Sequence, residues 1–238
     1  MVDVDQSLSS LLADQAGDNL SRAPGADIVA AVEAMVAHPD YPCLGARSVF
    51  RRGAATLVLL DDMSNAESLT QLSEALTGFE RASDPEGPFV SLVAAFRHPV
   101  IASEQDFENR LWSVLQHLHD SDDQPWADGV ADDPARAHFA FSHGGVPFFI
   151  VGLHPKASRI ARRTPVPVLV FNLHEQFERL RAEGGYERMR DKIRQRDQSL
   201  QGSLNPMVDD HGSSSEARQY AGRKVGDTWQ PPFEAHDA

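Results

Sequence analysis

The order of apolar and polar residues along the chain predicts alternating helices and strands. Apolar residues recur at helical spacing in five segments, residues 26–40, 64–79, 103–120, 173–185 and 186–200. Short apolar runs typical of strands occupy residues 54–62, 88–97 and 166–172. Two further apolar runs flank a glycine-containing turn within residues 138–153, which predicts a β-hairpin. This order indicates an α+β fold, with helices packed on a mostly antiparallel sheet.

Other parts of the chain lack a clear period. Residues 1–24 are polar, with only a weak helical pattern of leucines, and we expect a flexible N-terminal extension there. Residues 25–238 are expected to form a single domain, whose last forty residues are rich in turn formers and therefore loop-rich. We also expect an irregular stretch at residues 41–53 and a long polar loop at residues 121–136. Long loops in compact domains are often functional.

Length and composition indicate a globular cytoplasmic protein. The chain has 238 residues, of which 41% are hydrophobic, enough to bury a large core. Since no apolar run approaches the roughly 20 residues of a membrane span, we expect no membrane partner. The N-terminal sequence MVDVDQSLSS lacks the basic and apolar regions of a secretory signal. Cys43 is the single cysteine, which excludes an internal disulfide and a CxxC metal site.

Charge is unevenly distributed along the sequence. The chain carries 22 Lys and Arg against 35 Asp and Glu, a net charge of −13. Residues 156–196 nevertheless contain 11 basic and 5 acidic side chains, a local net of +6. The acidic remainder argues against nucleic-acid binding, whereas the basic island suits a small anionic ligand. For residues 188–196 we favour the alternative, a solvated helix face with ion pairs.

The segment GLHPKASRIARR, residues 152–163, is a candidate site for a charged cofactor. His154 ends an apolar strand, and Arg159, Arg162 and Arg163 follow within nine residues. An imidazole can ligate heme iron, and guanidinium groups can pair with the two propionates through charge-assisted hydrogen bonds. The same set suits an anionic substrate, and a histidine that caps a surface loop is a third interpretation.

Two other residues are candidate iron ligands. His119 lies on the same side of its predicted helix as Trp112 and Leu115, so it is either a core histidine bonded to a carbonyl or an axial ligand. Cys43 could bind iron as a thiolate, but the FxxGxxxCxG surroundings of cytochromes P450 are absent, and we favour a buried, inert thiol. The sequence also has no HExxH, GxSxG, GxxxxGK[ST] or GxGxxG motif, so peptidase, α/β-hydrolase, P-loop and dinucleotide-binding functions lose support.

Seven segments in order resemble those of the YqcI/YcgG family. They extend from about Asp40 to Phe233 and are YPCLGARS, WSVLQHLHD, FFIVGLHPKASRIARR, VFNLHEQFERLR, YERMRDKIRQRD, LQGSLNPM and SEARQYAGR. The family includes heme-dependent N-oxygenases, which oxidise amine, guanidine or aminoimidazole nitrogens in specialised-metabolite (natural product) pathways. The chain has WQPPF at residues 229–233, where the family motif has a cysteine, so a thiolate ligand from that motif is missing.

The resemblance implies a b-type heme that activates dioxygen or peroxide. Its implied axial ligand is His154, with His119 as the second candidate and His38 as the third. The groups implied around the porphyrin are Arg159, Arg162 and Arg163 for the propionates, with Phe149, Phe148 and Trp112 as apolar walls.

The resemblance also implies a nitrogen-containing small-molecule substrate. Glu216, Arg218 and Tyr220 are the candidate catalytic residues, and the Glu216 carboxylate suits a guanidine or amine; an internal ion pair is the alternative. Electrons would come from a separate donor such as a ferredoxin and its reductase, because no flavin or nicotinamide motif is present. A non-catalytic heme carrier or sensor and a heme-free binder of anionic metabolites stay open as alternatives, as does a homodimer.

Overall fold

The structure is a computed structural model that describes residues 6–17, 20–84, 86–203, 205 and 215–236. Within these residues a five-stranded sheet has the order β1-β2-β5-β4-β3. Its strands are β1 (Ala55–Asp62), β2 (Ser91–His98), β3 (Phe141–His143), β4 (Val146–Leu153) and β5 (Val168–Leu173). β1 and β2 are parallel, and the other three pairings are antiparallel. The predicted α+β fold with a mostly antiparallel sheet is confirmed.

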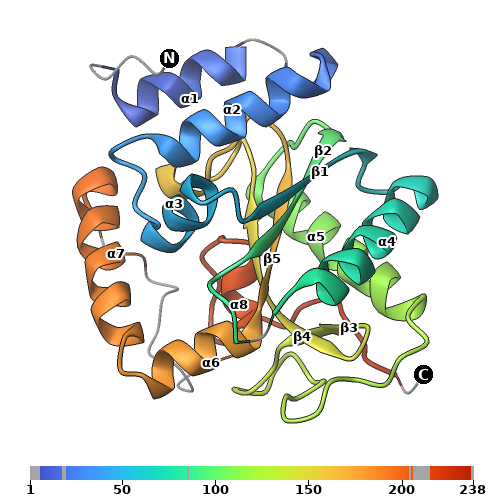
Figure 1. The fold of residues 1–238 in the computed structure, drawn as a ribbon. Coiled ribbons are helices and arrows are strands. Elements are labelled where there is room, and N and C mark those ends of the chain that lie inside the picture. The colour runs from blue at the N-terminus through green and yellow to red at the C-terminus, as the bar shows by residue number, and fades with distance from the viewer. Residues whose placement is uncertain (1–5, 18–19, 85, 204, 206–214, 237–238) are drawn as a thin grey trace.

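Helices cover both faces of the sheet (Figure 1). The α-helices are α1 (Leu8–Gly17), α2 (Gly25–Ala37), α3 (Leu44–Arg51), α4 (Ala66–Ala82), α5 (Glu104–Asp120), α6 (His174–Ala182), α7 (Tyr186–Gln201) and α8 (Ala217–Tyr220), and the 3-10 helices are η1 (Leu20–Arg22) and η2 (Ile160–Arg162). α4 and α5 pack on one face, whereas α2, α3, α6 and α7 lie on the other side, with α1 outside α2 (Figure 1). In the described part of the chain, no helix combines the length and the apolar character needed to cross a bilayer.

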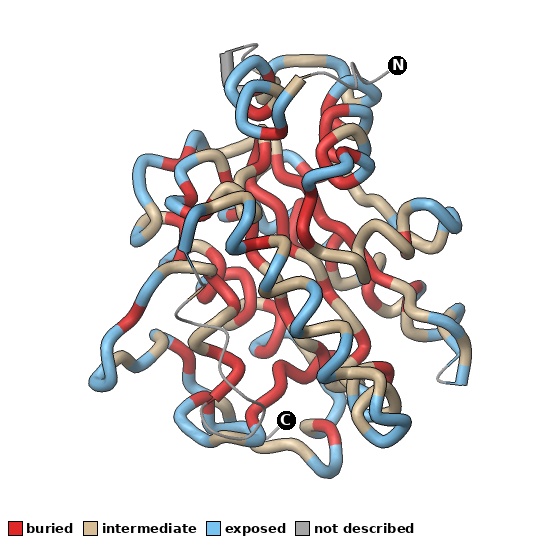
Figure 2. Tube along the Cα trace, turned by 90° about the vertical axis from the view of Figure 1, so that its left-hand side faces the viewer, coloured by how far each residue is buried: buried red, intermediate tan, exposed pale blue. Residues whose placement is uncertain are grey.

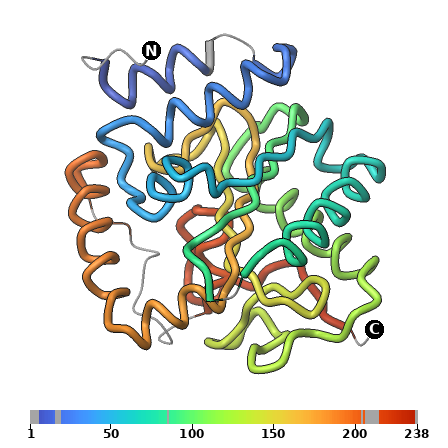
Figure 3. The backbone as a smooth tube through the Cα atoms, viewed as in Figure 1, coloured from blue at the N-terminus to red at the C-terminus, as the bar shows by residue number. Residues whose placement is uncertain are grey.

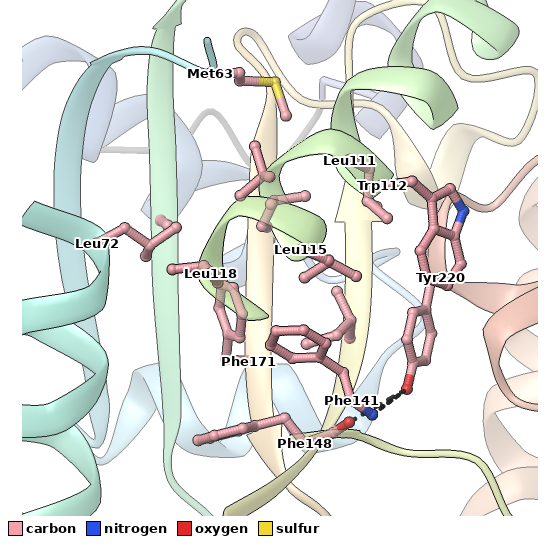
Figure 4. Close-up of a cluster of buried hydrophobic side chains, with 14 of the residues drawn as sticks. Met63, Leu72, Leu111, Trp112, Leu115, Leu118, Phe141, Phe148, Phe171 and Tyr220 are labelled. Carbon is pink, nitrogen blue, oxygen red and sulfur yellow. Dashed lines mark hydrogen bonds between the residues drawn. The ribbon is translucent and has the colours of Figure 1, made fainter. Parts of the chain in front are cut away.

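The larger hydrophobic core lies between the sheet and helices α4 and α5. Side chains at helical spacing on α5 face the alternate residues of β4 and β5 that point the same way (Figure 4). Tyr220 of α8 closes this core, and its hydroxyl accepts a hydrogen bond from Phe141 N and donates one to Phe148 O, both at 3.3 Å. Figure 2 shows that the buried residues concentrate in the centre of the molecule, along the strands.

The predicted β-hairpin is present as β3 and β4. Gly144 and Gly145 connect the strands with φ angles of 61° and 73°, the left-handed values that a two-residue type I′ turn requires. His143, the last residue of β3, is fastened to α4, because its Nδ1 lies 3.1 Å from Glu80 Oε1 and its Nε2 lies 3.0 Å from Ser73 Oγ. The hairpin is therefore tied to the α4 side of the sheet.

Two helices form where the sequence predicted irregular or flexible chain. α1 lies within the expected N-terminal extension and runs along α2 (Figure 3). Its Leu8 and Leu12, one turn apart, are buried in one cluster with Met35 of α2. α3 lies within residues 41–53, which were expected to be irregular. Its first turn is capped by Cys43, and Gly53, with φ of 65°, follows its end. α3 contributes residues to a cavity beside the sheet, whereas α1 packs on α2, which also lines that cavity.

Candidate functional site

A cavity of about 280 Å³ lies between the sheet and helices α2, α3 and α7, and part of its boundary is open to solvent. Its volume is just below the roughly 300–1,000 Å³ typical of small-molecule sites. The sheet wall comes from one face of β4 and β5, where Phe149, Val151 and Leu153 lie opposite Asn172, Val170 and Val168. The walls are mainly apolar, so they can exclude water from a bound group.

One face of α7 forms the opposite wall. Its lining residues recur every three or four positions, and they are Tyr186, Met189, Arg190, Ile193, Arg194 and Asp197. The interpretation of residues 188–196 as a solvated face with ion pairs is confirmed in part, because Arg190 pairs with Asp191 at 3.0 Å, but Arg190 and Arg194 also line the cavity. They do so because helical spacing places them on the same side as Met189 and Ile193.

The charged residues among those that line the cavity are four arginines and one aspartate, Arg159, Arg162, Arg190, Arg194 and Asp197. The lining therefore carries three more positive than negative charges. Arg159 and Asp197 form a buried ion pair, and Arg159 Nη2 also donates to Ser203 O at 2.9 Å. Asp197 Oδ1 is buried and accepts no hydrogen bond from any residue that the structure describes. A buried carboxylate oxygen without a donor is costly, so this atom is suited to accept one from a ligand.

Arg162 links the end of β4 to the C-terminal segment. Its guanidinium donates to Gly152 O at 3.0 Å and to Gln219 O at 3.2 Å, and Gln219 also lines the cavity. Burial lowers the pKa of Arg162. These contacts hold the guanidinium in a fixed position at the cavity wall.

Cys43 and Tyr41 also line the cavity, just before α3. The Sγ atom of Cys43 accepts a hydrogen bond from Ala46 N at 3.4 Å, so the thiol caps the helix N-terminus. Burial raises the pKa of the Cys43 thiol and of the Tyr41 phenol. Both groups are therefore neutral when the cavity holds no bound cation.

His154 lies on the other face of the sheet, toward α5. It follows Phe148 and Ile150 in the alternation of β4, and its ring stacks on Phe107 with 4.3 Å between centroids. The His154 side chain is buried, and burial lowers its pKa to about 4. Its Nδ1 accepts a hydrogen bond from Lys156 N at 3.2 Å. None of the described residues that line the cavity is a histidine.

The other predicted iron ligands also lie away from the cavity lining. His119 is buried beside Trp126 and Phe233, where burial lowers its pKa and its Nε2 accepts a hydrogen bond from His236 N at 3.0 Å. The Nε2 atom of His38 lies 2.8 Å from Gln6 O. The described residues contain no group of three or more His, Cys, Asp and Glu side chains placed to hold a metal ion.

The predicted cofactor-binding residues divide between the two sides of the sheet. Arg159, Arg162 and Phe149 come together in the cavity lining. Arg163 is not among the lining residues, and its Nε donates to Ala157 O at 2.8 Å. Trp112 is fully buried in the core on the α5 side, 5.7 Å from the Tyr220 ring.

The three predicted catalytic residues of the C-terminal segment point to different neighbours. Glu216 accepts a hydrogen bond from Arg181 Nη2 at 3.2 Å, and burial raises its pKa to about 7. Arg218 lies 3.6 Å from Asp227, and Tyr220 belongs to the core. The structure does not assemble these three side chains into one site.

The sequence did not place several polar lining residues at the site, among them Cys43, which was interpreted as an inert thiol, and Arg190, Arg194 and Asp197 of α7. The α7 residues carried a usable signal, because all three share a helical face with Met189. The position of Cys43 carried none, because the helix that it caps was not predicted.

The chain is similar to several known bacterial proteins. "Uncharacterized protein YqcI" of Bacillus subtilis (strain 168) is 26% identical over 162 residues, which are 66% of this chain and 64% of YqcI. "Uncharacterized protein YcgG" of the same organism is 24% identical over 189 residues, which are 76% of this chain and 75% of YcgG. "Putative N(omega)-hydroxy-L-arginine synthase DcsA" of Streptomyces lavendulae is 26% identical over 174 residues, which are 69% of this chain and 64% of DcsA.

The matched regions thus span less than two-thirds of the lengths of YqcI and DcsA. No solved structure matches the chain significantly. The sequence model of the YqcI/YcgG family matches residues 32–234, which include every element from α3 to α8 and all the described residues that line the cavity. The chain therefore belongs to the YqcI/YcgG family.

Proposed function

We propose that this protein is a heme-dependent N-oxygenase, which oxidises a nitrogen of a small guanidine, amine or amino-heterocycle in specialised metabolism. The observation that carries the proposal is the similarity to DcsA, whose name describes the N-hydroxylation of arginine. That similarity, within one family, suggests an N-oxygenase-like enzyme. The heme, the substrate and the electron donor are parts of the proposal.

The side chains around the cavity are chemically suited to a heme. The walls between the sheet and α2, α3 and α7 are mainly apolar, the chemical character that suits the faces of a porphyrin. The surplus of cavity arginines suits the two propionates, with Arg159, Arg162, Arg190 and Arg194 as the candidate partners. Cys43 and Tyr41 are of the residue types that ligate heme iron in proteins.

The substrate would be recognised through its own nitrogen. The buried Asp197 Oδ1 is available to accept a hydrogen bond from an N–H group, and a charged guanidinium or ammonium would strengthen that bond. Any cavity arginine that does not bind a propionate could hold a substrate carboxylate. These contacts would orient the reacting nitrogen, while the apolar walls exclude water from it.

A bound heme would supply the activation of dioxygen or peroxide and the transfer of one oxygen atom to the substrate nitrogen. The protein would orient the nitrogen, exclude water and balance charge. Reducing equivalents would come from a separate cytoplasmic donor such as a ferredoxin and its reductase. The cytoplasmic location and the homodimer stay predictions.

One alternative function has a structural observation in its favour. The positive surplus in the cavity also suits a heme-free protein that binds an anionic metabolite. A colourless protein whose melting temperature rises with phosphate or carboxylate ligands would support this alternative over the N-oxygenase. A carrier or sensor would bind heme but would not oxidise any nitrogen.

The test is to purify the protein from heme-supplied cells and to measure heme per chain and product formation. We expect about one heme per chain. We also expect N-oxygenated product from arginine-like or amino-heterocyclic compounds, either with a ferredoxin, its reductase and dioxygen or with peroxide alone. The variant Asp197→Asn should lose substrate binding while it retains heme. A protein without heme, or with heme but without turnover of any of these compounds, would contradict the proposal.

A further inference from the structure

Among the described residues that line the cavity, four have side chains of the types that ligate heme iron. They are the phenol of Tyr41, the thiol of Cys43 and the thioethers of Met35 and Met189. Met35 and Tyr41 are buried in the cluster that α1 forms with α2. Cys43 is only half-buried, because it faces the cavity. A neutral thioether is a weak ligand for ferric iron, so the thiol is the strongest candidate.

Although burial raises the pKa of the free Cys43 thiol, the backbone at the start of α3 can stabilise its sulfur once iron has displaced the proton. Cys43 is the N-cap of α3, and its Sγ already accepts the Ala46 N–H at 3.4 Å. The positive end of a helix and N–H groups aimed at sulfur both stabilise a negative sulfur atom. Hydrogen bonds to a ligand sulfur also tune the iron that it binds. When coordination to iron releases the thiol proton to solvent, the Ala46 N–H and the N-terminus of α3 would stabilise the resulting thiolate.

A second group in the same cavity indicates a ligand independently. The Asp197 side chain is 91% buried, and its Oδ1 has no hydrogen-bond donor among the described residues. This acceptor is placed to receive a hydrogen bond from a ligand with N–H or O–H groups, such as the proposed nitrogen-containing substrate. Four arginines line the same cavity, two of them paired with carboxylates, Arg159 with Asp197 and Arg190 with Asp191, and their side chains suit the two propionates.

The predicted histidine lies on the other side of the sheet. His154 is stacked on Phe107 of α5 and is 1% exposed, so its ring is packed within the protein. For His154 to ligate iron in the cavity, its ring would have to leave Phe107 and pass to the other face of β4. Cys43 needs no such rearrangement, because it already lines the cavity.

We propose that Cys43, and not His154, is the axial ligand of the iron. This assignment rests on the proposed heme dependence. It makes the protein a heme–thiolate enzyme whose ligand comes from the segment before α3, although the C-terminal motif WQPPF lacks a cysteine. A thiolate ligand donates electron density that favours cleavage of the O–O bond, which the proposed reaction needs.

The test compares Cys43→Ser with His154→Gln in protein purified from heme-supplied cells. Serine is a strong helix N-cap, so Cys43→Ser keeps the cap of α3 and removes only the sulfur. Absorption spectra of the ferrous carbon monoxide form and electron paramagnetic resonance of the ferric form distinguish thiolate from imidazole ligation. Circular dichroism and urea unfolding check that each variant is folded.

We expect a thiolate signature in the native protein, its persistence in His154→Gln and its loss in Cys43→Ser. Hemin binding should weaken in Cys43→Ser by at least the roughly 10–100-fold that follows loss of an outer-shell contact in metal sites. An imidazole spectrum that vanishes in His154→Gln and persists in Cys43→Ser would overturn the assignment and leave the heme enzyme standing. A native protein that binds no heme would overturn both.

Discussion

Two buried ionisable groups should have opposite effects on stability between pH 7 and pH 5. Burial lowers the pKa of His154 from 6.5 to about 4, so its stabilising contribution is present above pH 6.5 and is lost as the pH falls. Burial raises the pKa of Glu216 from 4.5 to about 7. The contribution of Glu216 is therefore fully present below pH 4.5 and is lost as the pH rises through 7.

The size of each effect follows from proton linkage. When the pH falls from 7 to 5, the unfolded imidazole becomes protonated and the folded one does not, which lowers the free energy of unfolding by about 2 kcal/mol. Over the same range the folded Glu216 carboxyl takes up a proton that the unfolded one largely does not, which raises the free energy of unfolding by about 2 kcal/mol. The two effects nearly cancel in the native protein.

Single variants separate the two groups. Urea unfolding of the heme-free protein at pH 7 and pH 5 gives the change in free energy of unfolding for each chain. Relative to the native protein, we expect His154→Gln to gain about 2 kcal/mol on acidification and Glu216→Gln to lose about 2 kcal/mol. His138→Gln, which removes an exposed imidazole, is the control and should follow the native protein. If all three variants shared the native pH dependence, the burial argument would be refuted.

Three further predictions test the packing by urea unfolding. Gly152→Ala should cost about 1–3 kcal/mol, because a Cβ there would lie 2.7 Å from Phe107 and 2.9 Å from Tyr220 O. The control Gly78→Ala, in α4 with open space around it, should instead raise the free energy of unfolding by about 0.5–1 kcal/mol. Equal effects of the two variants would contradict the close packing at Gly152. Tyr220→Phe should cost about 1–3 kcal/mol, because it removes the hydroxyl that joins Phe141 N to Phe148 O, and an unchanged midpoint would count against that bridge. Because Leu8 of α1 is buried against α2, Leu8→Ala should lower the free energy of unfolding by about 2 kcal/mol or more, whereas the control Ser9→Ala, at an exposed position, should leave it almost unchanged. An unchanged free energy of unfolding in Leu8→Ala would instead support a flexible extension.

Much of the fold could be predicted because most elements carry a clear period. The helical spacing of α4, α5 and α7 and the glycine turn of the β3–β4 hairpin were sufficient to locate them. α3 was missed because it is short and polar, and its cap is a cysteine rather than a common N-cap residue. α1 was treated as flexible because its helical signal is only a few leucines, which gain their burial from α2.

The site was harder to predict because proximity in sequence does not reveal which face of a sheet a residue reaches. The alternation of β4 places His154 on the side of Phe148, but the sequence does not say which helices cover that side. After β4 the chain turns through η2, and Arg159 and Arg162 reach the opposite side. His154 N donates a hydrogen bond to Arg162 O at 2.9 Å, yet the His154 ring packs on Phe107 while the Arg162 side chain lines the cavity.

The most direct test of the account is a crystal structure of the protein purified from heme-supplied cells. We predict a porphyrin in the cavity between the sheet and α7, with Cys43 Sγ bound to iron and the propionates among the cavity arginines. A porphyrin on the α5 side with His154 as its ligand, or crystals without heme from heme-supplied cells, would contradict the account.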